Sequence, residues 1–92
     1  MCYTVYILYS LQYDKIYIGF TSNLLERFKS HNELGKKGWT INYRPWKVIY
    51  CEYYIEKSAA MSREKHLKGG KGREWIRQRI LADYETLGFI SA

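Results

Sequence analysis

Four side chains that titrate or bind anions fall within the first third of the chain. Tyr6 and Tyr17 lie in stretches rich in β-branched and aromatic residues, and Arg27 and His31 follow four residues apart. Tyrosine and histidine carry hydrogen-bonding groups that titrate, and a guanidinium binds the oxygens of a carboxylate or a phosphate. We predict that all four are presented to one place. Taken alone, each tyrosine is more often a packed strand residue, and Arg27 more often a surface salt bridge.

Two strands and a helix would have to position these side chains. Residues 3–10 and 16–21 have the composition of strands, and the short stretch between them predicts a hairpin. A helix over residues 24–31 follows, with Ser22 or Asn23 as its cap.

The register of the hairpin decides which side chains share a face. One register gives a wholly apolar face from alternate residues of both strands, which are Val5, Ile7, Tyr9, Ile16, Ile18 and Phe20. That register places Tyr6 and Tyr17 together on the opposite face, and Gly19 would leave open space beside them. Arg27 and His31 are neighbours on the helix surface, at the edge of its apolar stripe, so we expect them to point along the sheet.

Length and composition bound the kind of protein. The 92 residues predict one domain, residues 1–92, with residues 86–92 as a short tail. We expect no membrane association and a cytoplasmic location, because neither a long apolar run nor a signal peptide is present. Cys2 and Cys51 are expected to be reduced thiols.

The charge of the chain is more informative. Fifteen Lys and Arg residues against nine Asp and Glu residues give a net charge of +6, with a pI near 9.4. The electrostatic field of such a charge favours anionic partners. A basic surface that only keeps the protein in solution explains the net charge equally well. Ten tyrosines and three tryptophans favour nucleic acid somewhat, because aromatic faces stack on bases, but most of these rings are expected in the core.

The middle of the chain predicts a basic loop and a third strand. Residues 33–45 contain loop-forming glycines and predict a mobile, basic loop. Five of its residues could follow a phosphate backbone or simply be solvated, namely Lys36, Lys37, Trp39, Tyr43 and Arg44. Residues 46–54 are apolar on both faces, as expected of a central or covered strand.

A second helix over residues 58–68 carries a carboxylate in an apolar stripe. Glu64 lies four residues after Ala60 and three before Leu67, where an ionised group is costly unless it is paired. A salt bridge to Arg27 or to a lysine is one explanation, and a ligand for Mg²⁺ or Mn²⁺ is the other. Glycines at 69–72 end this helix, and residues 73–84 predict a third helix. We assign four basic residues of this region to nucleic-acid binding, namely Arg63, Lys68, Lys71 and Arg73.

Taken together, these segments resemble the GIY-YIG nuclease superfamily, in its small stand-alone bacterial form. Val5-Tyr6-Ile7-Leu8 stands at the first motif and Tyr17-Ile18-Gly19 at the second, with Arg27, His31 and the helix that carries Glu64 following in order. Thr4-Val5-Tyr6 replaces Gly-Ile-Tyr, and the segment after Lys68 departs from the usual pattern, so the last polar site residue of the family is not placed. The resemblance implies an α+β fold, in which three helices flank a three-stranded antiparallel sheet.

The resemblance also implies a function. It predicts a DNA endonuclease that hydrolyses phosphodiesters with one divalent ion, Mg²⁺ or Mn²⁺, as in repair or recombination. Because so small a domain is expected to lack a sequence-reading module, we expect it to select DNA structure rather than sequence. Glu64 would hold the ion, Arg27 the phosphate, and Tyr6 would be the general base, supported by Tyr17, with His31 sharing proton transfer or binding phosphate. No small-molecule cofactor is expected, and the protein would be a monomer or weak dimer. A non-catalytic nucleic-acid-binding module and, less favoured, a protein-interaction domain are the alternatives.

Overall fold

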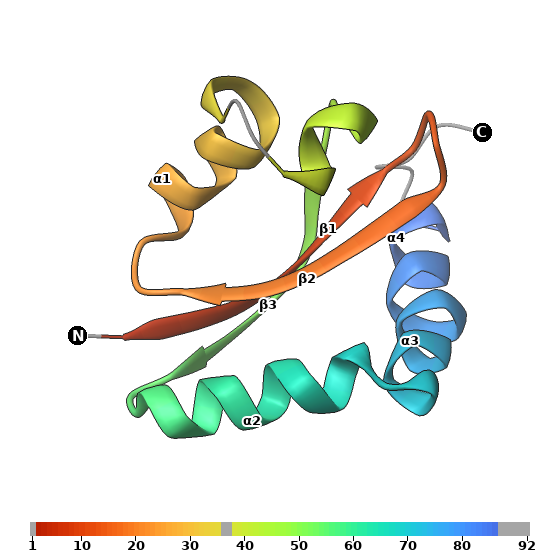
Figure 1. Cartoon of the computed structure of the whole chain (residues 1–92). Helices are drawn as coiled ribbons and strands as arrows, with labels where there is room; N and C mark the ends of the chain where they lie inside the picture. Colours follow the sequence, from red (N-terminus) through yellow and green to blue (C-terminus); the bar gives the residue numbers. More distant parts are fainter. Residues whose placement is uncertain (1, 36–37, 87–92) are drawn as a thin grey trace.

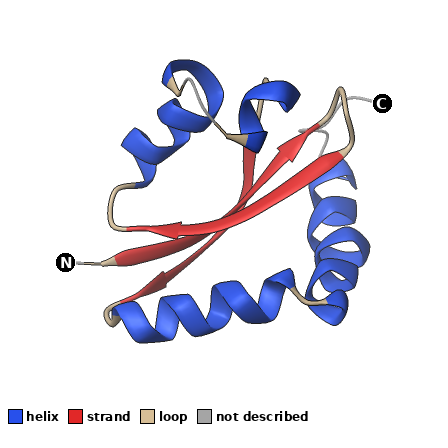
Figure 2. Ribbon diagram, in the orientation of Figure 1, coloured by secondary structure: helices blue, strands red, loops and turns tan. Residues whose placement is uncertain are grey.

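The fold is a three-stranded antiparallel sheet with helices on both faces (Figures 1 and 2). The computed structural model describes residues 2–35 and 38–86. The elements in chain order are β1 (Tyr3–Ser10), β2 (Lys15–Thr21), α1 (Leu24–Lys29), η1 (Ser30–Leu34), η2 (Trp39–Tyr43), β3 (Lys47–Tyr54), α2 (Lys57–Lys68), α3 (Gly70–Trp75), η3 (Ile76–Leu81) and α4 (Ala82–Thr86). The η1 turn continues α1, and α3, η3 and α4 follow one another without a break. The predicted α+β class, with three main helical segments around three strands, is confirmed.

The strand register is the one that the apolar alternation predicts. Val5 pairs with Phe20, Ile7 with Ile18 and Tyr9 with Ile16. This face packs against α2, α3 and η3 and forms the larger core, together with Ile49, Ala60, Leu67, Ile76 and Leu81. Because side chains alternate along a strand, Tyr6 and Leu8 point to the opposite face.

A smaller core lies on that opposite face. Tyr6, Leu8 and Trp46 are buried there, and partly buried residues of α1 and η2, including Phe28 and Tyr43, pack against them. The sheet therefore separates two layers, with α1, η1 and η2 on one side and α2, α3 and η3 on the other (Figure 1). Asn23 caps α1 as predicted, accepting a hydrogen bond from the backbone N–H of Glu26.

Of the two alternatives predicted for the third strand, central or covered, the first does not hold: β3 is an edge strand, because β1 takes the central position in the order β2-β1-β3. Two other local predictions are wrong. The segment read as a loop contains the 3₁₀ helix η2. The third helix begins at Gly70 rather than at residue 73. There Gly72 allows close packing on the end of α2, since a Cβ at Gly72 would lie 2.5 Å from the Leu67 Cα atom.

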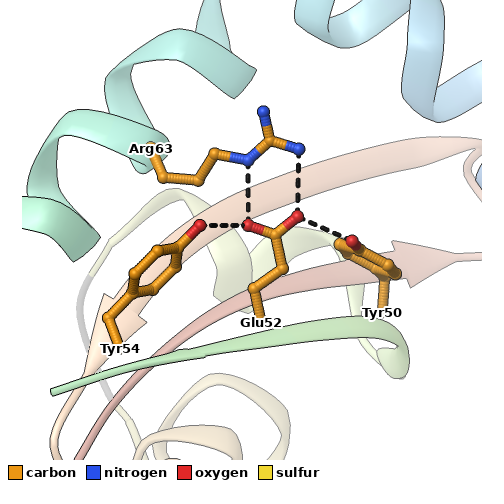
Figure 3. A network of polar contacts seen from close by, with 4 residues as sticks. All are labelled: Tyr50, Glu52, Tyr54 and Arg63. Carbon is orange, nitrogen blue, oxygen red and sulfur yellow. Dashed lines mark hydrogen bonds and ion pairs between the residues drawn. The ribbon is translucent and has the colours of Figure 1, made fainter.

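A polar network fixes α2 to β3 (Figure 3). Arg63 donates to both carboxylate oxygens of Glu52, with distances of 2.8 Å from Nε and 2.9 Å from Nη2. The hydroxyls of Tyr50 and Tyr54 each donate to the same carboxylate at 2.6 Å. Burial opposes ionisation of Glu52, but the hydrogen bonds from Arg63, Tyr50 and Tyr54 and the charge of Arg63 outweigh it and lower its pKa to about 2.

Within residues 2–35 and 38–86, no helix is both long and apolar enough to cross a bilayer.

Candidate active site

The two tyrosines of the predicted site lie side by side on the face covered by α1 and η2. The ring centroids of Tyr6 and Tyr17 are 6.2 Å apart, as the register predicts. Tyr6 is 1 % exposed because it comes from the central strand, whereas Tyr17 on the edge strand is half-buried.

Gly19 does not leave open space beside them, which corrects the expectation from the sequence. Gly19 pairs directly with Tyr6 across β1 and β2. A Cβ atom at Gly19 would lie 2.5 Å from the Tyr6 hydroxyl oxygen and 3.2 Å from Cε2 of Tyr17. The space that a side chain at position 19 would fill is therefore occupied by the hydroxyl of Tyr6. The absence of that side chain allows the Tyr6 ring to lie close over β2.

A hydrogen-bonded chain runs from Tyr6 through His31 to η2. The Tyr6 hydroxyl lies 2.9 Å from Nε2 of His31, and Nδ1 of His31 lies 3.0 Å from the Thr40 hydroxyl. Burial lowers the pKa of His31, and the positive charges of Arg27 and Arg44 lower it further. The imidazole is therefore neutral at pH 7 and has one nitrogen that can accept a proton.

The hydroxyl of Tyr6 is a weak acid in this setting. Burial raises its pKa to about 12, and Tyr17 and Glu64 add to the rise, whereas Arg27 partly offsets it by hydrogen bonding and charge. The guanidinium of Arg27 acts on both tyrosines, mainly on Tyr6, and its own pKa rises in return. Arg27 is otherwise exposed, so the same guanidinium is accessible to an anionic ligand.

Glu64 reaches this place from the other layer. It lies in α2, which packs against the edge strand β2, and its negative charge contributes to the raised pKa of Tyr6. Its side chain is 16 % exposed, and Lys68 approaches its Oε1 atom at 3.4 Å. Of the two explanations for Glu64, the salt bridge to a lysine is therefore present, and the lysine is Lys68.

The donor set near Glu64 fits one hard divalent ion. Across the described part of the chain, no three His, Cys, Asp or Glu side chains gather in a cluster. Mg²⁺ commonly keeps several water ligands and takes one or two carboxylates together with phosphate oxygens of the substrate. One partly buried carboxylate whose charge acts on Tyr6, on which Arg27 also acts, is compatible with such a site.

Two hollows adjoin the tyrosines along β2. Among the residues that the structure describes, no acidic side chain lines either hollow. The first is lined by Tyr17, Arg27, Ser30, His31, Gly38, Trp39 and Thr40. The second is lined by Ile16, Tyr17, Ile18, Trp39, Lys68 and Arg73.

The residues predicted to bind nucleic acid fall into separate groups. Lys68 and Arg73 line the second hollow, whereas Lys71 lines a different depression, formed with Glu74, Trp75, Gln78 and Arg79. Lys36 and Lys37 lie outside the described residues.

Two of the predicted arginines are instead held by the fold. Arg44 donates to the carbonyl oxygens of Ser30, His31 and Gly35 and so fixes the η1 turn. Arg63 is held by Glu52, with its guanidinium 5.3 Å from the ring centre of Trp75.

Thr40 is a site residue that the sequence did not indicate. Its hydroxyl is bonded to His31, and its carbonyl oxygen accepts the indole N–H of the buried Trp46 at 2.8 Å. The composition of residues 33–45 predicts a loop, and it does not indicate that a threonine nine residues after His31 lies against the imidazole.

The fold and the site define a small α+β domain. Two tyrosines of its β-hairpin lie with an arginine and a histidine of the next helical segment, and a glutamate in the opposite layer acts on one of the tyrosines by its charge. A model of the GIY-YIG catalytic domain matches residues 2–78, and the chain belongs to this family, whose members are generally nucleases.

Relatives of similar size match most of the chain. The UPF0213 protein CPE1444 of Clostridium perfringens is 38 % identical over 64 residues, which cover 70 % of this chain and 68 % of the relative. A UPF0213 protein of Limosilactobacillus reuteri is 33 % identical over 84 residues, covering 89 % and 84 %. The solution NMR structure of the UPF0213 protein BH0048 from Bacillus halodurans matches with a TM-score of 0.51 and 24 % identity over 87 % of both chains, which supports the fold.

Proposed function

We propose that this protein is a divalent-metal-dependent endonuclease that hydrolyses phosphodiester bonds in DNA. The observation that carries the proposal is that Tyr6, Tyr17, Arg27 and His31 lie together beside β2 and that the charge of Glu64 acts on Tyr6, although these residues come from five elements and both layers. Such a set combines an anion-binding group, a proton path and a carboxylate in one place.

Arg27 would hold the phosphate. Its exposed guanidinium can bind two non-bridging oxygens, and it would stabilise the charge that develops on them as the attacking water oxygen bonds to phosphorus and the sugar oxygen leaves. Lys68 and Arg73 in the second hollow would hold a neighbouring phosphate of the same strand.

Tyr6 and His31 would take the proton of the attacking water. A tyrosine with a pKa of about 12 is protonated at pH 7, so Tyr6 can accept a proton only if its own leaves. The neutral His31 is placed for this, with Nε2 at 2.9 Å from the tyrosine oxygen. The Thr40 hydroxyl would accept the Nδ1–H and keep Nε2 as the proton acceptor.

Glu64 would hold the divalent ion, Mg²⁺ or Mn²⁺, which when bound neutralises phosphate charge and lowers the pKa of its water ligand. The test is cleavage of end-labelled single-stranded, duplex, nicked and branched DNA with either ion, with EDTA, and with Glu64→Gln. We expect EDTA and Glu64→Gln to abolish cleavage, and the matched control Glu56→Gln, an exposed residue at the start of α2, to retain it. Cleavage that survives both EDTA and Glu64→Gln would contradict the proposal.

A second candidate is a nucleic-acid-binding module that does not cut. The burial and raised pKa of Tyr6 favour it, because both work against a tyrosine that acts as a base. This candidate predicts binding that weakens as salt rises and does not depend on Glu64. Salt-sensitive binding without cleavage of any of the four DNAs would support this non-catalytic module.

Gly19→Ala is expected to lower cleavage by roughly 10- to 100-fold, because a displacement of about 1 Å in a catalytic group can cost that much. The added methyl group would meet the Tyr6 hydroxyl at 2.5 Å and push it from His31. Gly70→Ala is the matched control, since a Cβ atom there has no neighbour within 4 Å. Single-turnover cleavage and thermal unfolding should be measured on both variants; equal rates would show that Tyr6 tolerates the displacement.

A further inference from the structure

Trp39 is an exposed aromatic ring that the fold holds in place. Its side chain is 46 % exposed. On the covered side of Trp39, its ring centroid lies 4.6 Å from that of Tyr43, 5.8 Å from that of Trp46 and 6.5 Å from that of Tyr17. The rings of Trp39 and Tyr17 are stacked. Trp46 is itself buried and bonded to the backbone of η2 through Thr40. The ring therefore presents apolar surface to solvent with little freedom to turn away.

The position of this ring relates it to the site. Trp39 and Tyr17 are the two residues that line both hollows beside β2. The first hollow also contains Arg27 and the second also contains Lys68 and Arg73. A polyanion that passes from one hollow to the other would cross the ring of Trp39 with cations on either side, which is the combination of stacking platform and positive groove that binds single-stranded nucleic acid.

We infer that Trp39 stacks on an unpaired base next to the phosphate held by Arg27, so that the substrate class is DNA with a single-stranded nucleotide at the site of cleavage. This inference rests on the proposed function of the site. In a continuous duplex both faces of each base are covered by neighbouring base pairs, and a ring that projects from a protein cannot stack on them. A single strand, a flap or a gap exposes the base face that Trp39 requires.

The test is binding without cleavage. Fluorescein-labelled single-stranded DNA, a duplex with a single-stranded flap and a blunt duplex of the same sequence would be titrated in EDTA, with fluorescence anisotropy as the readout. Wild-type protein, Trp39→Phe, Trp39→Leu and Trp39→Ala would be compared, and Tyr53→Ala is the matched control, because Tyr53 is 69 % exposed on β3. Trp39→Leu keeps an apolar group against Trp46, and thermal unfolding of each variant confirms that it is folded.

We expect wild-type protein to bind the single strand and the flap more tightly than the blunt duplex. Trp39→Leu and Trp39→Ala should lose roughly 5- to 100-fold of that affinity, as expected for loss of one stacked base, while Trp39→Phe and Tyr53→Ala stay close to wild type. Affinity for the blunt duplex should not change. A 2-aminopurine base placed in the flap should be quenched by wild-type protein and much less by Trp39→Leu.

Several results would overturn the inference. Tighter binding of the blunt duplex, an equal loss on all three DNAs, or wild-type affinity in Trp39→Leu would each exclude a stacking role while leaving the nuclease proposal intact. Tighter binding of an RNA strand of the same sequence would overturn the assignment to DNA. Absence of binding to every nucleic acid would overturn the proposed function as well.

Discussion

Tyr6→Phe is expected to reduce the single-turnover rate of DNA cleavage by about 100- to 10,000-fold, the usual contribution of a positioned general acid or base. Phenylalanine keeps the ring that packs between Leu8 and Trp46, so the smaller core should persist. What is lost is the oxygen that is hydrogen-bonded to Nε2 of His31, through which the proposed proton path from the attacking water would run. Substrate affinity should change little, because Arg27, Lys68 and Arg73 remain.

The matched control for this variant is Tyr9→Phe. Tyr9 is also a buried tyrosine of β1, but it lies on the opposite face and donates its hydroxyl to Asp14. Its variant should cleave at nearly the wild-type rate. If Tyr6→Phe and Tyr9→Phe cleaved equally well, the water would have to be activated without the tyrosine, and the proton path through His31 would be wrong.

Glu52→Gln is expected to lower the free energy of unfolding by about 3 kcal/mol, as for the loss of one partner from a buried ion pair. The neutral amide cannot accept the bidentate pair of hydrogen bonds from Arg63 and those of Tyr50 and Tyr54 together, so a partly buried guanidinium loses its counter-charge. Asp14→Asn is the matched control, because the Asp14–Arg77 pair is well exposed, at 66 % and 44 %, and asparagine tolerates the φ of 52° at that position. The control should cost less than about 1 kcal/mol.

The stability of the wild type should also depend on pH in a defined window. The pKa of Glu52 is about 2 in the folded protein, against an ordinary value of 4.5, so the unfolded chain binds the proton more readily. The contribution of the network is therefore complete above pH 4.5 and is lost as the pH falls from there towards 2. Urea unfolding at pH 7 and at pH 3 should show the gap between wild type and Glu52→Gln closing at the lower pH. A constant gap would mean that the carboxylate is not stabilised in its charged form.

Local pattern was enough to predict the sheet hairpin and the pairing of its tyrosines. The alternation of apolar residues in 3–10 and 16–21 permits few registers, and the observed one places Tyr6 beside Tyr17. The cap was predicted at Ser22 or Asn23 from the preference of both residue types for the N-cap position, and it is Asn23.

The structural features that the sequence did not predict depend on contacts between residues that are distant in the chain. The apolar composition of β3 does not distinguish a central strand from an edge strand whose faces are covered by helices. The hydrogen bonds that hold Arg44 and Arg63 could not be predicted, because their acceptors, the carbonyl oxygens of residues 30, 31 and 35 and the carboxylate of Glu52, lie 9 to 14 residues away in the chain. The relation of Thr40 to His31 depends on a 3₁₀ turn that the composition of residues 33–45 did not indicate.

The attachment of α2 to β3 has a consequence for how the site can evolve. Arg63 and Glu64 are consecutive, and neighbours on a helix point about 100° apart. With Arg63 held at the β3 side of the sheet by Glu52, Glu64 is turned towards β2 and the tyrosines. If the proposed activity is under selection, that selection extends to positions 52 and 63, which are expected to change together in descent. Exchange of one without the other would remove the contact that fixes this turn of α2, while every residue of the proposed site remained unaltered.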